Sequence, residues 1–243
     1  MFKFKTNKEQ LIESQKNGAS LVTVTKPNSV VAEQFRTIRT NIQFSMIDRD
    51  LKSLIFTSSG PGEGKSTTSA NLAVVFATQG KRVLLVDADM RKPSVNKTFK
   101  LSNHEGLTTL LTEKEVVLGD VVHETNTENL FILTSGPIPP NPSELLDSKK
   151  MNRVIEILEE TFDLVIFDMP PIVSVTDAQI MASKTDGTVF VIRNGIATKE
   201  AVLKAKQLLD IVNANVVGTI FNGLEKEKIK LTSIMELKVK TND

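Results

Sequence analysis

A glycine-rich loop stands between a strand pattern and a helix pattern in the first third of the chain. Residues 53–57 (SLIFT) read as a buried strand, residues 59–67 (SGPGEGKST) form the loop, and residues 65–78 read as a helix. Glycines let the backbone curl until its N–H groups point inward at phosphate oxygens, and the helix adds the positive end of its dipole. A strand, such a loop and a helix in this order predict a P-loop that binds a nucleotide.

The loop sequence also predicts roles for its side chains, with ATP and Mg²⁺ as the cofactors. We expect Lys65 to bridge the β- and γ-phosphates and the Ser66 hydroxyl to bind Mg²⁺. The other loop residues expected to contact the nucleotide are Gly60, Gly62, Glu63, Gly64 and Thr67. The alternative, a glycine turn that binds nothing, is disfavoured by the strand and helix on either side.

The rest of the chain repeats a strand–helix pattern. Further strands are predicted at residues 82–86, 129–133, 164–167, 188–192 and 216–221, and further helices at 29–45, 151–160 and 199–212. The strands VLLV and LVIF are apolar throughout, as expected where helices cover both faces of a sheet. The pattern predicts an α/β fold with a mostly parallel central sheet and helices on both faces.

Three regions are expected along the 243 residues. Residues 1–28 are predicted to be a flexible lead-in that contains a short strand at 21–25, residues 29–223 the nucleotide-binding domain, and residues 224–243 a charged tail. The formal net charge of +1 makes no electrostatic case for nucleic acid, and the absence of cysteine excludes disulfides and thiolate metal sites. No apolar run reaches about 18 residues, so we expect any membrane role to come through a partner.

Acidic residues follow two of the predicted strands. Asp87, Asp89 and Arg91 come directly after VLLV, and residues two apart on an extended segment face the same way. Near phosphates, two carboxylates can hold hydrated Mg²⁺, or one can accept a proton from an attacking hydroxyl. Asp168 ends the strand LVIF, where a magnesium-organising carboxylate sits, although a lone Asp there can also cap a helix. Because ligands bind at the carboxyl ends of parallel strands, the three acids predict a catalytic edge.

The predicted helix at 29–45 carries a polar stripe of Glu33, Arg36 and Arg39. At about 100° per residue it falls away from the apolar stripe of residues 31, 35, 38 and 42, so we expect it outside the core. Two interpretations remain open: a solvated face with a weak ion pair, or a subunit interface in which arginine forks bind carboxylates.

Taken together, these motifs resemble those of the bacterial tyrosine kinases of capsular and exopolysaccharide synthesis. The resemblance rests on SSGPGEGKST, LLVDADMR, VIFDMPP, the Glu/Arg helix and the loop GPIPPNPSELL, and covers residues 24–222. It is similar in particular to the short Gram-positive form, which works with a separate transmembrane adaptor. The resemblance implies a cytoplasmic protein recruited to the inner face of the membrane by that adaptor.

Membership would imply transfer of the γ-phosphoryl group of ATP to a tyrosine hydroxyl. By this resemblance Lys65 stabilises the transferred group, and Mg²⁺ is organised by Ser66, Asp87 and Asp168. Either Asp89 or Asp87 is the base. Arg91 is expected to stabilise charge or to anchor its loop, and Asn222 to contact the adenine. The helix with Glu33, Arg36 and Arg39 is expected to form a ring-shaped homo-oligomer.

The chain departs from the family in one respect, because it contains no tyrosine. The family's C-terminal tyrosine cluster is missing, so tyrosine autophosphorylation is not expected and the substrates are tyrosines of other proteins. An alternative is a nucleotide-gated assembly module without useful kinase activity. A further alternative is a partitioning-type ATPase of the same superfamily, which carries a second lysine where this loop has Gly60.

Overall fold

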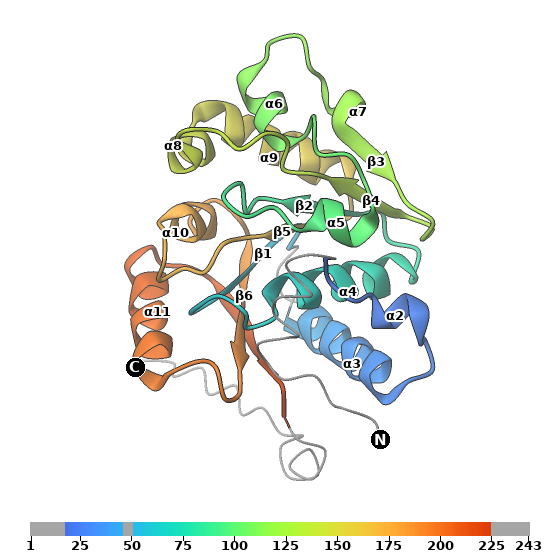
Figure 1. The fold of residues 1–243 in the computed structure, drawn as a ribbon, viewed down its shortest axis with the longest axis vertical. Coiled ribbons are helices and arrows are strands. Elements are labelled where there is room, and N and C mark those ends of the chain that lie inside the picture. The colour runs from blue at the N-terminus through green and yellow to red at the C-terminus, as the bar shows by residue number, and fades with distance from the viewer. Residues whose placement is uncertain (1–17, 46–50, 225–243) are drawn as a thin grey trace, which may run out of the picture.

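The computed structural model describes residues 18–45 and 51–224. In these ranges one seven-stranded sheet, with the order β3-β4-β2-β5-β1-β6-β7, lies between two layers of helices (Figure 1). The strands are β1 (Ser53–Ser58), β2 (Val83–Asp87), β3 (Val122–Glu124), β4 (Leu130–Leu133), β5 (Leu164–Asp168), β6 (Gly187–Arg193) and β7 (Val216–Asn222). Only the β3–β4 pairing within this described sheet is antiparallel. The predicted α/β fold with a mostly parallel sheet is confirmed.

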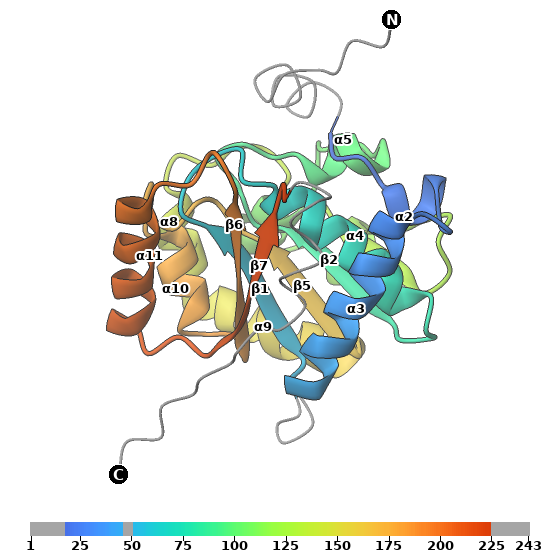
Figure 2. The ribbon, with the colours of Figure 1, turned by 90° about the horizontal axis from the view of Figure 1, so that it is seen from below.

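Helices cover both faces of the sheet. They are α2 (Val22–Thr25), α3 (Val30–Ser45), α4 (Lys65–Ala77), α5 (Val95–Phe99), α6 (Leu107–Thr112), α7 (Leu118–Val121), α8 (Pro142–Asp147), α9 (Lys149–Thr161), α10 (Asp177–Ala182) and α11 (Lys199–Ile211). Figure 2 shows α3 and α4 on one side of the sheet and α9, α10 and α11 on the other. None of the helices in residues 18–45 and 51–224 combines the length and apolarity needed to cross a membrane.

The central strands are buried on both sides because their alternate side chains pack into two hydrophobic cores, one on each face of the sheet. In β2, Leu84 and Val86 belong to the core under α9 and α10, whereas Val83 and Leu85 belong to the core under α4. All residues of β1, β2 and β5 are buried. This accounts for the uninterrupted apolar strands in the sequence.

Parallel pairing brings the predicted acids to one edge of the sheet. Asp87 at the end of β2 lies in register with Asp168 at the end of β5. β5 also pairs with β1, and the glycine-rich loop leaves the end of β1 to enter α4. The sheet topology alone therefore places the loop and two carboxylates together.

The N-terminal prediction is wrong for the part of it that the structure describes. Residues 22–25 form helix α2 rather than a strand, and the Thr23 N–H and hydroxyl both donate to Oδ1 of Asn71 on α4, at 3.1 and 2.9 Å. The Ala19 N–H donates to the Thr98 hydroxyl at 2.8 Å. Residues 18–25 are thus held against α4 and α5 and are not a flexible lead-in. The alternation of apolar and polar residues at 21–25 is only five residues long, and these residues contact Asn71 on α4 instead of pairing with a strand.

Other differences concern short elements. The predicted long helices and strands are confirmed within one or two residues at most ends, but β3 and the helices α5, α6, α7, α8 and α10 were not predicted. Each has only three to six residues, too few to show a period. Most of the predicted charged tail, and residues 1–17 of the predicted lead-in, lie outside the described residues.

Candidate nucleotide-binding site

The glycine-rich loop takes a shape that only glycine permits at two positions. Gly62 and Gly64 have φ angles of 79° and 94°, in the left-handed region. A Cβ at Gly64 would lie 2.2 Å from Nδ2 of Asn222, so a larger residue there would have to displace that side chain. The loop is therefore curled as a phosphate cradle requires and is pressed against the end of β7.

Glu63 braces the loop from within. Its carboxylate accepts hydrogen bonds from the Ser59 hydroxyl and the Gly60 N–H, and only 1% of the residue is exposed. The Asn222 side chain donates to the Glu63 carbonyl at 3.2 Å, which ties the loop to β7. The Glu63 side chain thus stabilises the shape of the loop. Because its carboxylate is used within the loop, we expect only the backbone of Glu63 to contact the nucleotide. Asn222 lies beside the loop, and its contact with adenine stays a prediction.

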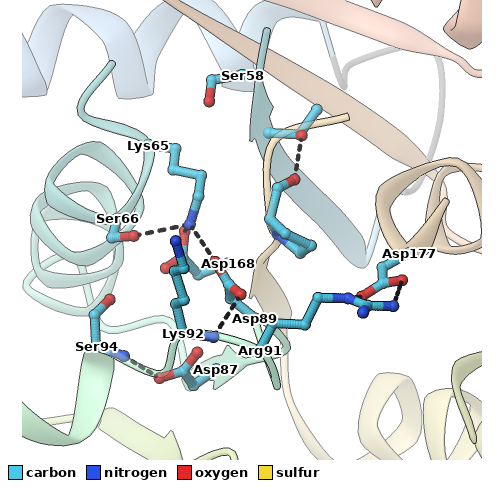
Figure 3. A network of polar contacts seen from close by, with 12 residues as sticks. Ser58, Lys65, Ser66, Asp87, Asp89, Arg91, Lys92, Ser94, Asp168 and Asp177 are labelled. Atoms are coloured by element: carbon cyan, nitrogen blue, oxygen red, sulfur yellow. Dashed lines mark hydrogen bonds and ion pairs between the residues drawn. The ribbon is translucent and has the colours of Figure 1, made fainter. Parts of the chain in front are cut away.

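Lys65 points from the start of α4 into the group of acids (Figure 3). Its Nζ lies 3.1 Å from the Ser66 hydroxyl, 3.1 Å from Oδ2 of Asp89 and 3.6 Å from Oδ1 of Asp168. Burial alone would lower the pKa of Lys65, but the charges of Asp168 and Asp89 outweigh it and raise that pKa. Lys65 therefore stays cationic and neutralises part of the acidic site.

Asp87 is held by the loop that follows β2. Its Oδ2 accepts the N–H groups of Ser94 and Val95, both at 2.9 Å, while Oδ1 is buried without a hydrogen-bond partner among the described residues. Burial and the charge of Asp168 raise the pKa of Asp87 to about 7, against the opposing effect of the two N–H donors. One carboxylate oxygen is thus fixed and the other remains available.

Both carboxylate oxygens of Asp168 are buried, and neither has a geometrically good hydrogen-bond partner among the described residues, although Oδ1 forms an ion pair with Nζ of Lys65 at 3.6 Å. Burial raises the pKa of Asp168, and the nearby charge of Lys65 opposes this effect. The Asp168 oxygens, with Oδ1 of Asp87 and the Ser66 hydroxyl, are the hard ligands that Mg²⁺ prefers. No group of three His, Cys, Asp or Glu side chains in residues 18–45 and 51–224 is arranged to hold a metal alone. The residues fit an ion that phosphate oxygens help to bind.

The side chains of Asp89 and Arg91, in the loop after β2, point in different directions (Figure 3). Oδ2 of Asp89 faces Lys65, whereas the Arg91 guanidinium makes two hydrogen bonds of 2.9 and 3.0 Å to the buried carboxylate of Asp177 (Figure 3). The expectation that all three side chains of DADMR point to one side is wrong. β2 ends at Asp87, so strand alternation no longer applies beyond it. Arg91 makes the contact of an anchor, one of the two roles expected for it.

Two residues around this site were not identified from the sequence. Asp177, at the start of α10, has no motif to mark it and meets Arg91 only through the fold. Lys92 donates its backbone N–H to Oδ1 of Asp89 at 3.1 Å. Its position directly after DADMR was the only available signal.

The Glu/Arg stripe lies on α3 and is more engaged with its own chain than the sequence indicated. Arg36 pairs with Glu33 and donates to the Pro27 carbonyl at 2.6 Å. Arg39 donates to the Val75 carbonyl at 3.2 Å, and burial lowers its pKa. Arg39 is therefore partly buried, contrary to the expectation of a stripe wholly outside the core.

The predicted apolar stripe of α3 is confirmed at Phe35, Ile38 and Ile42, which pack in or against the core, but not at Val31. Val31 is 47% exposed, while Ala32 is fully buried and Ile42 is 5% exposed. Ala32 thus takes the inward position at the start of α3 that was expected for Val31. The helix itself is confirmed, and its partner surface remains untested.

Comparison with known proteins agrees with this site. A family model described as an AAA domain matches residues 51–216. The chain is 50% identical to tyrosine-protein kinase YwqD of Bacillus subtilis (strain 168) over 209 residues, which cover 86% of this chain and 88% of that protein. It is 42% identical to the putative tyrosine-protein kinase CapB of Staphylococcus aureus over 203 residues, 84% of this chain and 89% of the relative. The crystal structure of the chimerical protein CapA2B2 superposes with a TM-score of 0.82 and 38% identity, covering 88% of this chain and 99% of that chain.

Proposed function

The chain belongs to the bacterial tyrosine-protein kinases, and we propose that it transfers the γ-phosphoryl group of Mg·ATP to tyrosine hydroxyls of other proteins. The observation that carries this proposal is the position of Asp89. Its carboxylate lies 3.1 Å from the loop lysine, Lys65, where an acceptor hydroxyl would meet the γ-phosphate. A protein kinase needs a carboxylate that accepts the proton of the acceptor hydroxyl, and Asp89 is placed to take that role.

The remaining roles follow from the geometry of the site. Loop N–H groups and Lys65 would bind the phosphates, and Ser66, Asp87 and Asp168 would hold Mg²⁺, which supplies charge neutralisation. The phenol oxygen forms a bond to the γ-phosphorus as the bond between that phosphorus and the ADP oxygen breaks. The phenol proton passes to Asp89, so atoms and charge balance.

The contacts of the two candidate bases favour Asp89 over Asp87. Oδ2 of Asp87 is occupied by two backbone N–H groups, and the residue is fully buried. Asp89 is 5% exposed. Its Oδ1 accepts the Lys92 N–H, and its Oδ2 faces Lys65, which the incoming phosphates would attract away. We therefore assign Asp89 as the base and Asp87 to the metal.

The biological setting rests on the family resemblance. We propose that the kinase acts in capsular or exopolysaccharide synthesis and export. A transmembrane adaptor would bring it from the cytoplasm to the inner face of the membrane. Self-association would use the exposed part of the Glu/Arg stripe, where Glu33 keeps 68% of its side chain exposed.

A second candidate function is an assembly module whose ATP binding gates contacts with the adaptor. The observation that favours it is the absence of tyrosine from the 243 residues, since phosphorylation between subunits has no tyrosine acceptor here. The kinase proposal accommodates the same fact by placing the acceptors on partner proteins.

A matched pair of acceptors separates the two candidates. We would incubate the purified chain, Mg·ATP and the cytoplasmic part of an adaptor with a tyrosine-containing peptide, or with the same peptide carrying phenylalanine. The kinase proposal predicts phosphate on the tyrosine peptide alone. ATP-dependent association with the adaptor without any labelled tyrosine would favour the assembly module.

A further inference from the structure

Lys92 brings a second side-chain ammonium to the nucleotide site. It stands in the loop after β2, where its N–H donates to the Asp89 carbonyl at 3.2 Å and to Oδ1 of Asp89 at 3.1 Å. In Figure 3 the Lys92 side chain extends from this loop in the direction of Lys65, whereas the neighbouring Arg91 extends away to Asp177. These two successive basic side chains therefore point to different parts of the site (Figure 3).

The other two cations near Asp89 are already paired. Lys65 contacts Asp89 and Asp168, and Arg91 is held by Asp177. Lys92 is exposed, and its ammonium has no ion-pair partner in residues 18–45 and 51–224. The backbone of Lys92 is therefore fixed beside the proposed base, Asp89, and its ammonium is available to bind a ligand.

The charge balance of the loaded site leaves room for such a cation. Three carboxyl groups, on Asp87, Asp89 and Asp168, interact with the ammonium of Lys65, and the Mg²⁺ proposed for this site would add two positive charges. ATP adds further negative charge, and the transition state spreads charge over three equatorial oxygens of the transferred group. Fixed positive groups aimed at that charge stabilise the transition state more than the ground state.

We propose that Lys92 is a second catalytic cation, whose ammonium binds the γ-phosphoryl oxygens from the loop after β2 while Lys65 binds them from α4. This rests on the proposed phosphoryl transfer and deepens it. The short link between Lys92 and Asp89 also couples the two functions, because the same turn presents the base and the cation. Arg91 then anchors that turn through Asp177.

The test compares a ground-state and a transition-state ligand in variants of Lys92. Lys92→Gln removes the charge, Lys92→Arg keeps it, and Lys100→Gln removes an exposed charge just after α5 as a matched control. Affinities for Mg·ADP, and for Mg·ADP with aluminium fluoride as the phosphoryl mimic, are measured by calorimetry. The turnover number is measured with a tyrosine-bearing protein.

We expect Lys92→Gln to bind Mg·ADP within about twofold of the parent chain and to bind the aluminium fluoride complex at least about 10-fold more weakly. Its turnover number should fall about 100-fold, the typical effect of removing one transition-state donor. Lys92→Arg should recover most of both losses, and Lys100→Gln should match the parent.

Three outcomes would overturn the proposal. The first is an unchanged preference for the fluoride complex in Lys92→Gln, and the second is an equal loss for both ligands, which indicates a displaced loop. The third is a parent chain that binds the aluminium fluoride complex no more tightly than Mg·ADP alone. If instead the fluoride complex depends on Lys92 but no tyrosine is labelled, the role of Lys92 stands and the tyrosine kinase assignment fails.

Discussion

The Nζ atom of Lys65 lies 3.1 Å from Oδ2 of Asp89, and the two side chains are 13% and 7% exposed. This ion pair joins the loop lysine to the proposed base. Incoming phosphates compete with Asp89 for Lys65, because both present anionic oxygens to one ammonium. We infer that nucleotide binding frees the Asp89 carboxylate for the acceptor hydroxyl, so that the base becomes available only in the loaded site.

Asp89→Asn tests the assignment of the base. Asparagine keeps the size of the side chain and its acceptor oxygen but cannot take a proton, so the turnover number should fall at least about 100-fold. Nucleotide affinity should change by less than about threefold, because binding rests on the loop. Steady-state kinetics and calorimetry with Mg·ATP measure the two quantities.

Asp87→Asn is the matched control for that experiment. If Asp87 holds the metal, both turnover and Mg²⁺-dependent affinity fall. The assignment is contradicted if Asp89→Asn loses turnover and affinity in equal measure, or if only Asp87→Asn shows the selective loss of turnover.

Asp87 also predicts a pH dependence of stability in the nucleotide-free protein. Its pKa is raised from 3.8 to about 7 by burial and by Asp168, so the folded state prefers the protonated carboxyl. A raised folded-state pKa stabilises the fold fully below the unfolded value, and this stability is lost as pH rises toward 7. Asp168, Asp89 and Lys65 all interact electrostatically with Asp87, and the Asp87→Asn variant retains these three residues.

We therefore expect Asp87→Asn to gain stability over the parent chain as pH increases. Urea unfolding with a chelator should show a larger difference in the free energy of unfolding at pH 8 than at pH 5. A difference that stays constant across this range would show that the Asp87 carboxyl does not titrate between these values.

The contact of the N-terminal segment with α4 gives a stability prediction. The Asn71 amide accepts from the N–H and the hydroxyl of Thr23 and donates to the carbonyls of Ser20 and Thr67, in a fully buried position. Asn71→Ala leaves several buried groups unpaired and should cost about 3 kcal/mol of unfolding free energy. Asn126→Ala, at an exposed loop position, should cost less than about 0.5 kcal/mol. Similar costs in the two variants would show that the N-terminal segment is not held by Asn71.

The stripe on α3 gives a prediction about assembly. Replacing Glu33, Arg36 and Arg39 by alanine should convert a ring-shaped oligomer into monomers. Because Arg39 also holds the Val75 carbonyl, Arg39→Ala alone should lower stability by about 1 kcal/mol, whereas Glu33→Ala with Arg36→Ala should change the mass with a smaller effect on stability. Light scattering and thermal unfolding separate the two effects. An unchanged mass in the triple variant would support the solvated-face interpretation.

Some features of the fold and of the site follow from local sequence patterns, and others depend on distant contacts. Parallel strands bring their carboxyl ends to one edge, so the meeting of Asp87 and Asp168 follows from the α/β pattern. The direction of Arg91 does not, because it depends on where β2 ends and on Asp177, 86 residues further along. Similarly, the helix at residues 22–25 depends on Asn71, which no local pattern around Thr23 reveals.

The most direct measurement of the central claim is phosphoryl transfer from radiolabelled Mg·ATP, followed by phosphoamino acid analysis. It compares the chain alone, the chain with a tyrosine-bearing partner such as an adaptor, and a version extended after Asp243 by a tyrosine-rich segment. Each is repeated with Lys65→Met, which removes the side-chain cation of the loop and should abolish transfer. We predict no phosphotyrosine on the chain alone, label on the partner, and label between subunits of the extended version. Partner labelling that is equal in the parent chain and in Lys65→Met, or an extended chain that binds ATP yet stays unlabelled with adaptor present, would contradict the kinase assignment.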